Sequence, residues 1–357
     1  MLLNSQTVKK AAHTLLGASA MWMVATVSAT FSQTSLAASD AQGYSQHPQA
    51  QALMDQLVSE HDFSREELQQ WFSKAEKKQS ILDAMSRPAE KTKTWGEYRN
   101  IFIKPSRISK GVEFWQTHQE TLERAEQVYG VPAEIIVAII GVETRYGSNK
   151  GSYKVIDALS TLAFDYPKRS PFFTKELRHF LLLAREQNRD PLALKGSYAG
   201  AMGYGQFMPS SYREYAKDFD GDNAVDIWDN PVDAIGSVAN YFVRHGWKSD
   251  KPVVTRARVS KDYDRSVIND SLRPKRTVGE LAAQGITSIE SLDSNAKATA
   301  MKLKGEQGAE FWVGLQNFYA ITRYNHSRLY AMAVYQLSQE VRREMDATLT
   351  AQAKPAS

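Results

Sequence analysis

The 357-residue chain contains no cysteine, which excludes disulfides, cysteine-ligated zinc, iron–sulfur clusters, thiol nucleophiles and a lipid-modified N-terminal cysteine. It has little net charge: 44 Lys and Arg face 40 Asp and Glu, and +4 is too weak to predict nucleic acid as a partner. It also lacks compositional bias, with 42% hydrophobic, 10% aromatic and 24% charged residues, so a fibrous or wholly disordered protein is excluded. This length is enough for two or three globular domains.

No hydrophobic run reaches the roughly 20 residues that a bilayer-spanning helix needs. The nearest approach follows two lysines close to the N-terminus, where the apolar part of an uncharged stretch is Leu15–Val27. Small residues ending at Ala29 and Ala37 then resemble signal-peptidase sites. Residues 1–38 are therefore predicted to be a signal peptide, with an uncleaved anchor as the alternative. The mature chain is expected to be exported, with no transmembrane helix and no lipid anchor.

The first third of the mature chain shows helical hydrophobic periodicity. Residues 47–90 are predicted to be helical, and a second helix is predicted over about 108–129, ending at Gly130. Pro88 and Pro105 mark the loop between them.

The rest of the chain is helical in pattern except for a segment that begins near residue 253. Residues 131–247 are almost all helical, broken by a glycine-rich and an aspartate-rich loop. Residues 253–259 alternate like a short strand, and the following fifty mix turns with short helical pieces. Helical periodicity returns near Phe311. The fold class predicted is mainly α (α+β): a helical protein with a small inserted α/β subdomain.

One acidic residue stands at the end of an unusually apolar helix. Pro132 suits the first turn, and Ile135–Val142 is apolar on every face, so this helix is expected to be buried all round. Glu143 follows directly, and Gly147 is expected to end the helix. Ionising a buried carboxyl is costly, so its pKa is expected to rise, as a general acid requires. The alternative is a Glu143 that pairs with Arg145 or another cation.

A glycine-rich stretch lies some fifty residues further on. Residues 195–209 read KGSYAGAMGYGQFMP, in which glycines allow the backbone to approach a ligand closely. There is no Gly-Lys-Ser/Thr ending, so the loop is no phosphate cradle. The alternative is a tight connection between two helices.

Three motifs in order carry a family resemblance. Residues 141–147 (GVETRYG), 200–211 (GAMGYGQFMPSS) and 231–241 (PVDAIGSVANY) resemble the lytic murein transglycosylase B family, and the resemblance spans Ser64 to Leu337. It implies a helical core like that of goose-type lysozyme. It also implies cleavage of the MurNAc–GlcNAc bond of peptidoglycan in the periplasm, leaving a 1,6-anhydro-MurNAc end.

The division that follows from texture and resemblance has six parts. They are a signal peptide over 1–38, an N-terminal helical subdomain over 39–130, a lysozyme-like catalytic core with the metal loop over 131–250, an inserted β-containing subdomain over 251–310, C-terminal helices over 311–350, and a frayed tail over 351–357.

The resemblance also assigns roles to single residues. Glu143 matches the catalytic acid/base, while Ser197 and Gln206 match positions that contact the sugar near the scissile bond. The residues assigned to the glycan groove are Tyr98, Phe207, Tyr241, Asn325 and Tyr330. For each tyrosine the alternative is ordinary half-buried packing. Lys168 and Arg169 stand where the family tends to show two arginines; both suit anionic stem peptides, although lysine does not bind a carboxylate bidentately.

The aspartate-rich loop has the spacing of a calcium site. Asp218, Asp220 and Asp222 occupy loop positions 1, 3 and 5, and the Ala224 carbonyl stands at position 7. Asn223 takes the place of the usual glycine, and asparagine tolerates positive φ. The resemblance points to Asp233 as the remaining ligand. A structural Ca²⁺ or Na⁺ is predicted, with a solvated acidic turn as the alternative.

Only one carboxyl near these motifs is marked for chemistry, whereas glycoside hydrolases normally use two. The next acids downstream are Asp157 and Asp165. The prediction is therefore a non-hydrolytic lyase with Glu143 as the single acid/base and no cofactor for chemistry. Peptidoglycan glycan strands are the expected partner, with other cell-wall enzymes as further partners and a monomeric state. A hydrolytic muramidase and an inactive peptidoglycan-binding protein are the alternatives.

Overall fold

The computed structural model describes residues 43–86 and 93–353; of residues 352 and 353 it describes the backbone only. The predicted signal peptide lies outside these residues. The described residues belong to one compact unit. The division of this unit into subdomains stays a prediction.

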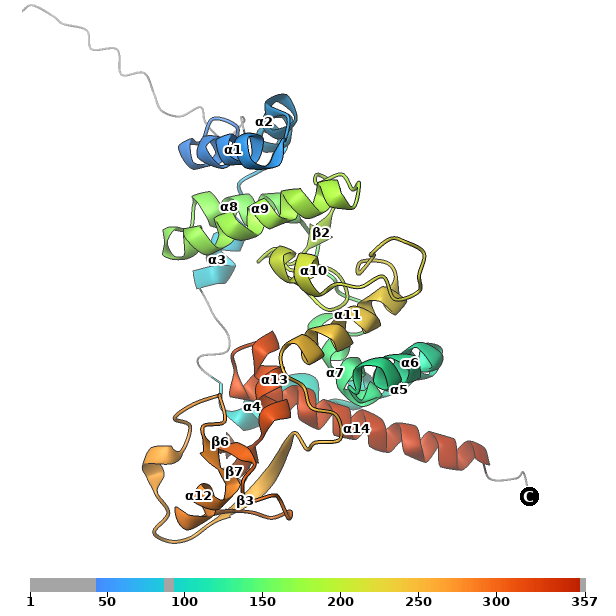
Figure 1. The fold of residues 1–357 in the computed structure, drawn as a ribbon, viewed down its shortest axis with the longest axis vertical. Helices are drawn as coiled ribbons and strands as arrows, with labels where there is room; N and C mark the ends of the chain where they lie inside the picture. Colours follow the sequence, from blue (N-terminus) through green and yellow to red (C-terminus); the bar gives the residue numbers. More distant parts are fainter. Residues whose placement is uncertain (1–42, 87–92, 354–357) are drawn as a thin grey trace, which may run out of the picture. The chain divides into compact units, whose positions relative to one another are not determined.

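The chain is mainly helical, as predicted (Figure 1). The helices, in chain order, are α1 (Pro48–His61), α2 (Arg65–Lys74), α3 (Gln79–Ser86), α4 (Trp95–Phe102), α5 (Pro105–Thr117), α6 (Gln119–Tyr129), α7 (Ala133–Thr144), α8 (Val155–Phe164), α9 (Ser170–Glu186), α10 (Pro209–Tyr215), α11 (Pro231–Arg244), α12 (Val278–Ala283), α13 (Gln316–Tyr324) and α14 (Arg328–Ala353), with the 3₁₀ turns η2 (Pro167–Arg169) and η3 (Arg265–Val267).

The segment before α7 differs from the prediction. The loop expected between Pro88 and Pro105 contains α4, whose start at Thr94 is closed by a capping box with Glu97. The single helix expected over 108–129 is two helices, because α5 begins at Pro105 and the chain breaks at His118 before α6. Proline at a first helical turn starts a helix as readily as it interrupts one, which explains the error.

Two short strands lie between helices of the main core, and the other strands of the described residues follow the alternation that begins near residue 253. They are β1 (Tyr153–Lys154), β2 (Lys195–Gly196), β3 (Val254–Val259), β4 (Arg276–Thr277), β5 (Ile286–Ser288), β6 (Lys297–Gly305) and β7 (Gly308–Gly314). The last five form an antiparallel sheet of order β4-β6-β7-β3-β5. The sheet covers its own small cluster of buried apolar residues, among them Val267, Leu281 and Val313.

Two predicted boundaries shift at the end of the chain. Strand β7 continues to Gly314, past the point near Phe311 where helices were expected to resume, because it pairs with β6 along its whole length. Helix α14 runs to Ala353, into the segment predicted as a frayed tail from residue 351.

Helix α7 lies at the centre of the main hydrophobic core. Its residues from Ala133 to Gly141, Glu134 excepted, are buried, which confirms the prediction from its apolar run. It packs against α5, α6, α11 and α14 (Figure 1). The short β1–β2 pair joins the segment after α7 to the start of the glycine-rich loop through Tyr153 and Gly196. The fold therefore brings the end of α7, the glycine-rich loop and α14 to one place.

Within residues 43–86 and 93–353, no single helix is both long and apolar enough to cross a membrane. The pair α6 and α7 passes that test together but bends by 115° at its break.

Candidate active site and aspartate loop

Glu143 lies in the last turn of α7 and is half-buried. The hydroxyl of Tyr330, from the first turn of α14, donates a 2.5 Å hydrogen bond to its Oε1 atom across 187 residues of sequence. Tyr330 is only 3% exposed, and burial together with the charge of Glu143 holds the pKa of its hydroxyl well above the usual value. Both the raised pKa and the geometry favour Tyr330 as the donor to the Glu143 carboxyl.

Tyr324 is a further member of this group that sequence reasoning missed. Its hydroxyl donates a 2.6 Å hydrogen bond to the Gly205 carbonyl in the glycine-rich loop. Burial raises its pKa, and the nearby charge of Glu143 adds to the effect. A side chain on Gly205 would come within 2.8 Å of the Tyr324 hydroxyl, so this position requires glycine. Tyr324 directly precedes Asn325, but a tyrosine in a helix by itself reads as ordinary packing.

Two of the predicted aromatic residues, Phe207 and Tyr241, lie beside Tyr324. Phe207 lies 5.6 Å from Tyr241 and 6.0 Å from Tyr324, and Tyr241 lies 4.7 Å from Tyr324, between ring centroids. The Tyr241 hydroxyl donates to the Arg323 carbonyl. Phe207 and Tyr241 are both buried, so the structure shows them packed against one another beside Tyr324 and Glu143.

The glycine-rich loop is held in one conformation by its own polar groups. The Ser197 Oγ accepts hydrogen bonds from the backbone N–H groups of Ala199 and Ala201. Gln206 has a φ of 51°, and its side-chain amide donates to the carbonyls of Gly203 and Lys150. Both predicted sugar contacts therefore also order the loop, and Gln206 adopts a backbone conformation that asparagine and glycine adopt more readily.

Thr144 joins the loop to α7. This fully buried threonine follows Glu143, and its hydroxyl lies 3.0 Å from the Tyr204 carbonyl and 3.1 Å from the Ile140 carbonyl. The same oxygen accepts a hydrogen bond from the Gly147 N–H. The sequence offered no sign of this contact, because its partner lies sixty residues away.

The helix does not end at Gly147 as expected. It ends at Thr144, and both Arg145 and Tyr146 adopt left-handed backbone conformations, with φ of 52° and 60°. The N–H groups of these residues donate to the carbonyls of Gly141 and Ile140, which closes the helix before the glycine is reached.

The remaining predicted substrate residues have different surroundings. Tyr98, in α4, is buried and close enough to Tyr330 for its charge to raise that residue's pKa. Asn325 follows α13 in extended conformation. Lys168 and Arg169 are exposed in η2, and the Arg169 guanidinium lies over the rings of Phe172 and Phe173 in α9. The roles of all four in substrate binding stay predictions.

The two acids closest downstream of Glu143 have structural partners. Asp157 is 2% exposed and accepts a hydrogen bond from the backbone of Glu76. Asp165 accepts from the Tyr44 hydroxyl and forms an ion pair with Lys77. Both carboxylates connect the α8 region to the N-terminal segments, and that neither is a second catalyst stays a prediction.

The aspartate loop brings three of its predicted ligands together. Carboxylate oxygens of Asp218, Asp220 and Asp222 lie within 4.8 Å of one another. Asn223, at the position where calcium loops usually have glycine, has a φ of 69°, as expected. The role of the Ala224 carbonyl as a ligand stays a prediction.

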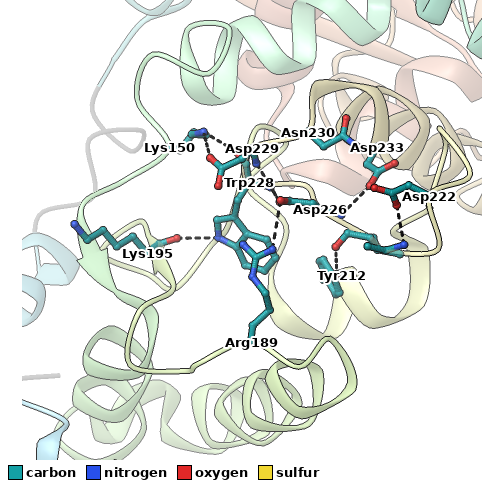
Figure 2. A network of polar contacts seen from close by, with 12 residues as sticks. Lys150, Arg189, Lys195, Tyr212, Asp222, Asp226, Trp228, Asp229, Asn230 and Asp233 are labelled. Atoms are coloured by element: carbon teal, nitrogen blue, oxygen red, sulfur yellow. Dashed lines mark hydrogen bonds and ion pairs between the residues drawn. The ribbon is translucent and has the colours of Figure 1, made fainter.

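Asp233 braces this loop from the start of α11. It is fully buried, and its two oxygens accept hydrogen bonds of 2.7 Å from the N–H groups of Phe219 and Asp226. Figure 2 shows Asp233 beside Asp222 and Asp226, with the Asp226 carboxylate linked to Arg189 and to the backbone near Trp228. Burial raises the pKa of Asp233. The role of Asp233 as a metal ligand stays a prediction.

Comparison with known proteins identifies the class. The family model described as "Transglycosylase SLT domain" matches residues 45–339, so the chain belongs to this family. Membrane-bound lytic murein transglycosylase B of Escherichia coli is 47% identical over 307 residues, which cover 84% of each chain. The predicted family, fold class and enzyme class, a lytic transglycosylase, are thereby confirmed.

Solved structures agree with this assignment. Soluble lytic transglycosylase SltB1 of Pseudomonas aeruginosa is 56% identical, with a TM-score of 0.80 over 83% of this chain and 99% of that chain. The E. coli lytic transglycosylase Slt35 in complex with calcium is 46% identical, with a TM-score of 0.78 over 85% and 97%. SltB3 of P. aeruginosa in complex with NAG-NAM-pentapeptide is 30% identical, with a TM-score of 0.75 over 84% and 80%.

Proposed function

We propose that this chain cleaves the β-1,4 bond between MurNAc and GlcNAc in peptidoglycan and leaves a 1,6-anhydro-MurNAc end, with Glu143 as its single acid/base. The observation that carries the proposal is the position of the Glu143 carboxyl at the end of the buried helix α7, where it accepts a hydrogen bond from the buried hydroxyl of Tyr330. The substrate class is supported by the relatives, one named for murein and one solved with NAG-NAM-pentapeptide.

The reaction needs one carboxyl that serves twice. Glu143 first donates its proton to the glycosidic oxygen as the bond to C1 of MurNAc breaks, and GlcNAc leaves with a hydroxyl group. The ionised Glu143 then takes the proton of the MurNAc C6 hydroxyl while that oxygen bonds to C1. The carboxyl is regenerated, no water is consumed, and the product is the anhydro sugar.

Residues around Glu143 support each half of this cycle. The Tyr330 hydroxyl donates to the carboxylate and stabilises it in the interval when it is ionised. The structural partners of Asp157 and Asp165 support a mechanism without a second acid. Ser197 and Gln206 orient the sugar and its acetamido group from the ordered loop. The glycan groove is lined by Phe207, Tyr98, Tyr241, Asn325 and Tyr330.

Digestion of purified sacculi in water labelled with ¹⁸O tests the reaction. Anhydro ends without label support the lyase. Labelled reducing ends would mean a muramidase, and no release would mean an inactive binding protein. Glu143→Gln serves as the blank, and Glu134→Gln is its matched control. Glu134 lies in the first turn of the same helix, where it pairs with Arg342.

We further propose that the aspartate loop binds Ca²⁺ through Asp218, Asp220, Asp222 and the Ala224 carbonyl, with Asp233 as the remaining ligand. The three clustered carboxylates match the oxygen ligands that Ca²⁺ prefers, and the relative solved with calcium supports this choice over Na⁺. The ion would be structural, because the site belongs to a loop that precedes α11 and not to the Glu143 group. Asp233 holds the loop in shape for it.

The place of action follows from the substrate. Peptidoglycan lies outside the cytoplasmic membrane, so we propose that the chain is exported by its N-terminal segment and acts as a periplasmic monomer without a lipid anchor. The absence of cysteine supports the last point. The exposed cations Lys168 and Arg169 would meet the anionic stem peptides.

A further inference from the structure

The chain reverses direction immediately after the helix that carries Glu143. Arg145 and Tyr146 are consecutive residues with left-handed backbone, a conformation that side chains other than glycine and asparagine adopt rarely. Strained backbone of this kind persists only where the surrounding contacts compensate for it. The contacts of the Tyr146 ring supply that compensation.

The ring of Tyr146 folds back beneath the last turn of α7 into a slot between two glycines. A side chain on Gly141, two residues before Glu143, would come within 2.5 Å of the ring. A side chain on Gly111, in α5, would come within 2.6 Å of the Tyr146 hydroxyl. Phe114, also in α5, lies 5.8 Å from the ring between centroids. The slot exists because both helices carry glycine where the ring passes.

Arg107 fastens the same turn from the α5 side. Its guanidinium donates a 2.6 Å hydrogen bond to the Gly141 carbonyl, a C-terminal group of α7 that attracts a cation. The Tyr146 hydroxyl is buried and has no hydrogen-bond partner among the described residues, so the side chain is held by packing and not by a hydrogen bond. Thr144, the residue after Glu143, is joined to the glycine-rich loop.

We propose that Tyr146 is a positioning residue for Glu143: its ring, wedged between Gly141 and Gly111 and braced by Arg107, sets the direction in which the carboxyl leaves the end of α7. Because the turn after α7 is packed against α5, the Glu143 carboxyl keeps its position when Glu143 is protonated and its hydrogen bond from Tyr330 weakens. This inference rests on the proposed role of Glu143 and adds a requirement that family membership does not state.

The test measures kcat and KM on sacculi at a temperature where circular dichroism shows every variant folded. Tyr146→Leu removes the ring and should lower kcat about 10- to 100-fold with KM changed less than about threefold. The reason is that displacing a catalytic carboxyl by about 1 Å lowers the rate by up to about this factor. Tyr146→Phe keeps the ring and should stay within about twofold of the parent. Gly141→Ala fills the slot and should lower kcat as Tyr146→Leu does.

A double variant and a core control separate positioning from stability. Gly141→Ala should add less than about twofold once Tyr146→Leu has removed the ring that it displaces. Phe180→Leu is the control: it shortens a fully buried ring in α9, which packs against α8 and α10, and should lower the melting temperature without lowering kcat.

Three results would overturn the proposal. These are a Tyr146→Leu enzyme with unchanged kcat, a Tyr146→Phe enzyme as slow as Tyr146→Leu, and a Gly141→Ala enzyme with unchanged kcat; the last decides alone if Tyr146→Leu does not fold. Failure of the proposed function looks different, because Glu143→Gln would then remain active. An inactive Glu143→Gln beside a fully active Tyr146→Leu rejects only the positioning role.

Discussion

The hydrogen bond from Tyr330 to Glu143 makes a quantitative prediction for Tyr330→Phe. The change removes one buried oxygen and leaves the ring, so the surrounding core should keep its packing. A bond to a charged group contributes about 1.5–3 kcal/mol and a bond to a neutral group about 0.5–1.5 kcal/mol. In the proposed reaction Glu143 passes from neutral acid to carboxylate, so the bond strengthens by about 1–1.5 kcal/mol as the barrier is crossed.

Only this difference affects the rate, because an interaction that is equal in ground state and transition state does not change kcat. At about 1.4 kcal/mol per factor of ten, Tyr330→Phe should lower kcat about 5- to 12-fold while KM changes little. The assay is the initial rate of soluble muropeptide release from sacculi over a range of substrate concentrations. Tyr335→Phe, in the same helix α14, is the matched control and should leave kcat unchanged.

Two outcomes would contradict this reasoning. A Tyr330→Phe enzyme with kcat within twofold of the parent would mean that the bond is equally strong in both states. A loss expressed only in KM would mean that Tyr330 contributes to glycan binding alone and does not act through Glu143.

Four further changes have expected outcomes. Glu143→Gln should keep the fold and glycan binding but lower turnover by about two to four orders of magnitude, and more than about a tenth of the parent rate on sacculi would contradict its role. Ca²⁺ should raise the melting temperature, and Asp218→Asn with Asp222→Asn should abolish that gain while activity stays nearly intact; identical melting curves with and without chelator would refute the site. Asp157→Asn should leave kcat within about tenfold, as measured on sacculi. The pKa of Tyr330 is raised above the ordinary 10.0, so the contribution of its protonated hydroxyl to the free energy of unfolding should be complete below pH 10 and fall at higher pH. Urea unfolding below and above pH 10 measures this change, with Tyr330→Phe for comparison.

Local patterns were sufficient to predict the framework of the site. The run Ile135–Val142 has no polar face, so it had to be a buried helix, and the next residue, Glu143, had to lie at its end. Alternation over 253–259 likewise predicted β3, and the spacing of acids predicted the cluster at Asp218. These features depend on neighbours in sequence, which periodicity records.

The partners of Glu143 depended on the fold as a whole. Tyr330 lies 187 residues away, and the Thr144 bond to Tyr204 spans sixty, so no local period relates them. Tyr146 was visible only as part of a motif, since nothing in its neighbourhood shows that its ring returns to Gly141. Side chains that meet across helices are chosen by packing, because burial and hydrogen bonding act between whatever surfaces the fold brings together. The position of Glu143 is therefore determined by the sequence of its own helix, whereas its hydrogen-bond donor and the side chains packed around it come together only when α5, α7 and α14 pack.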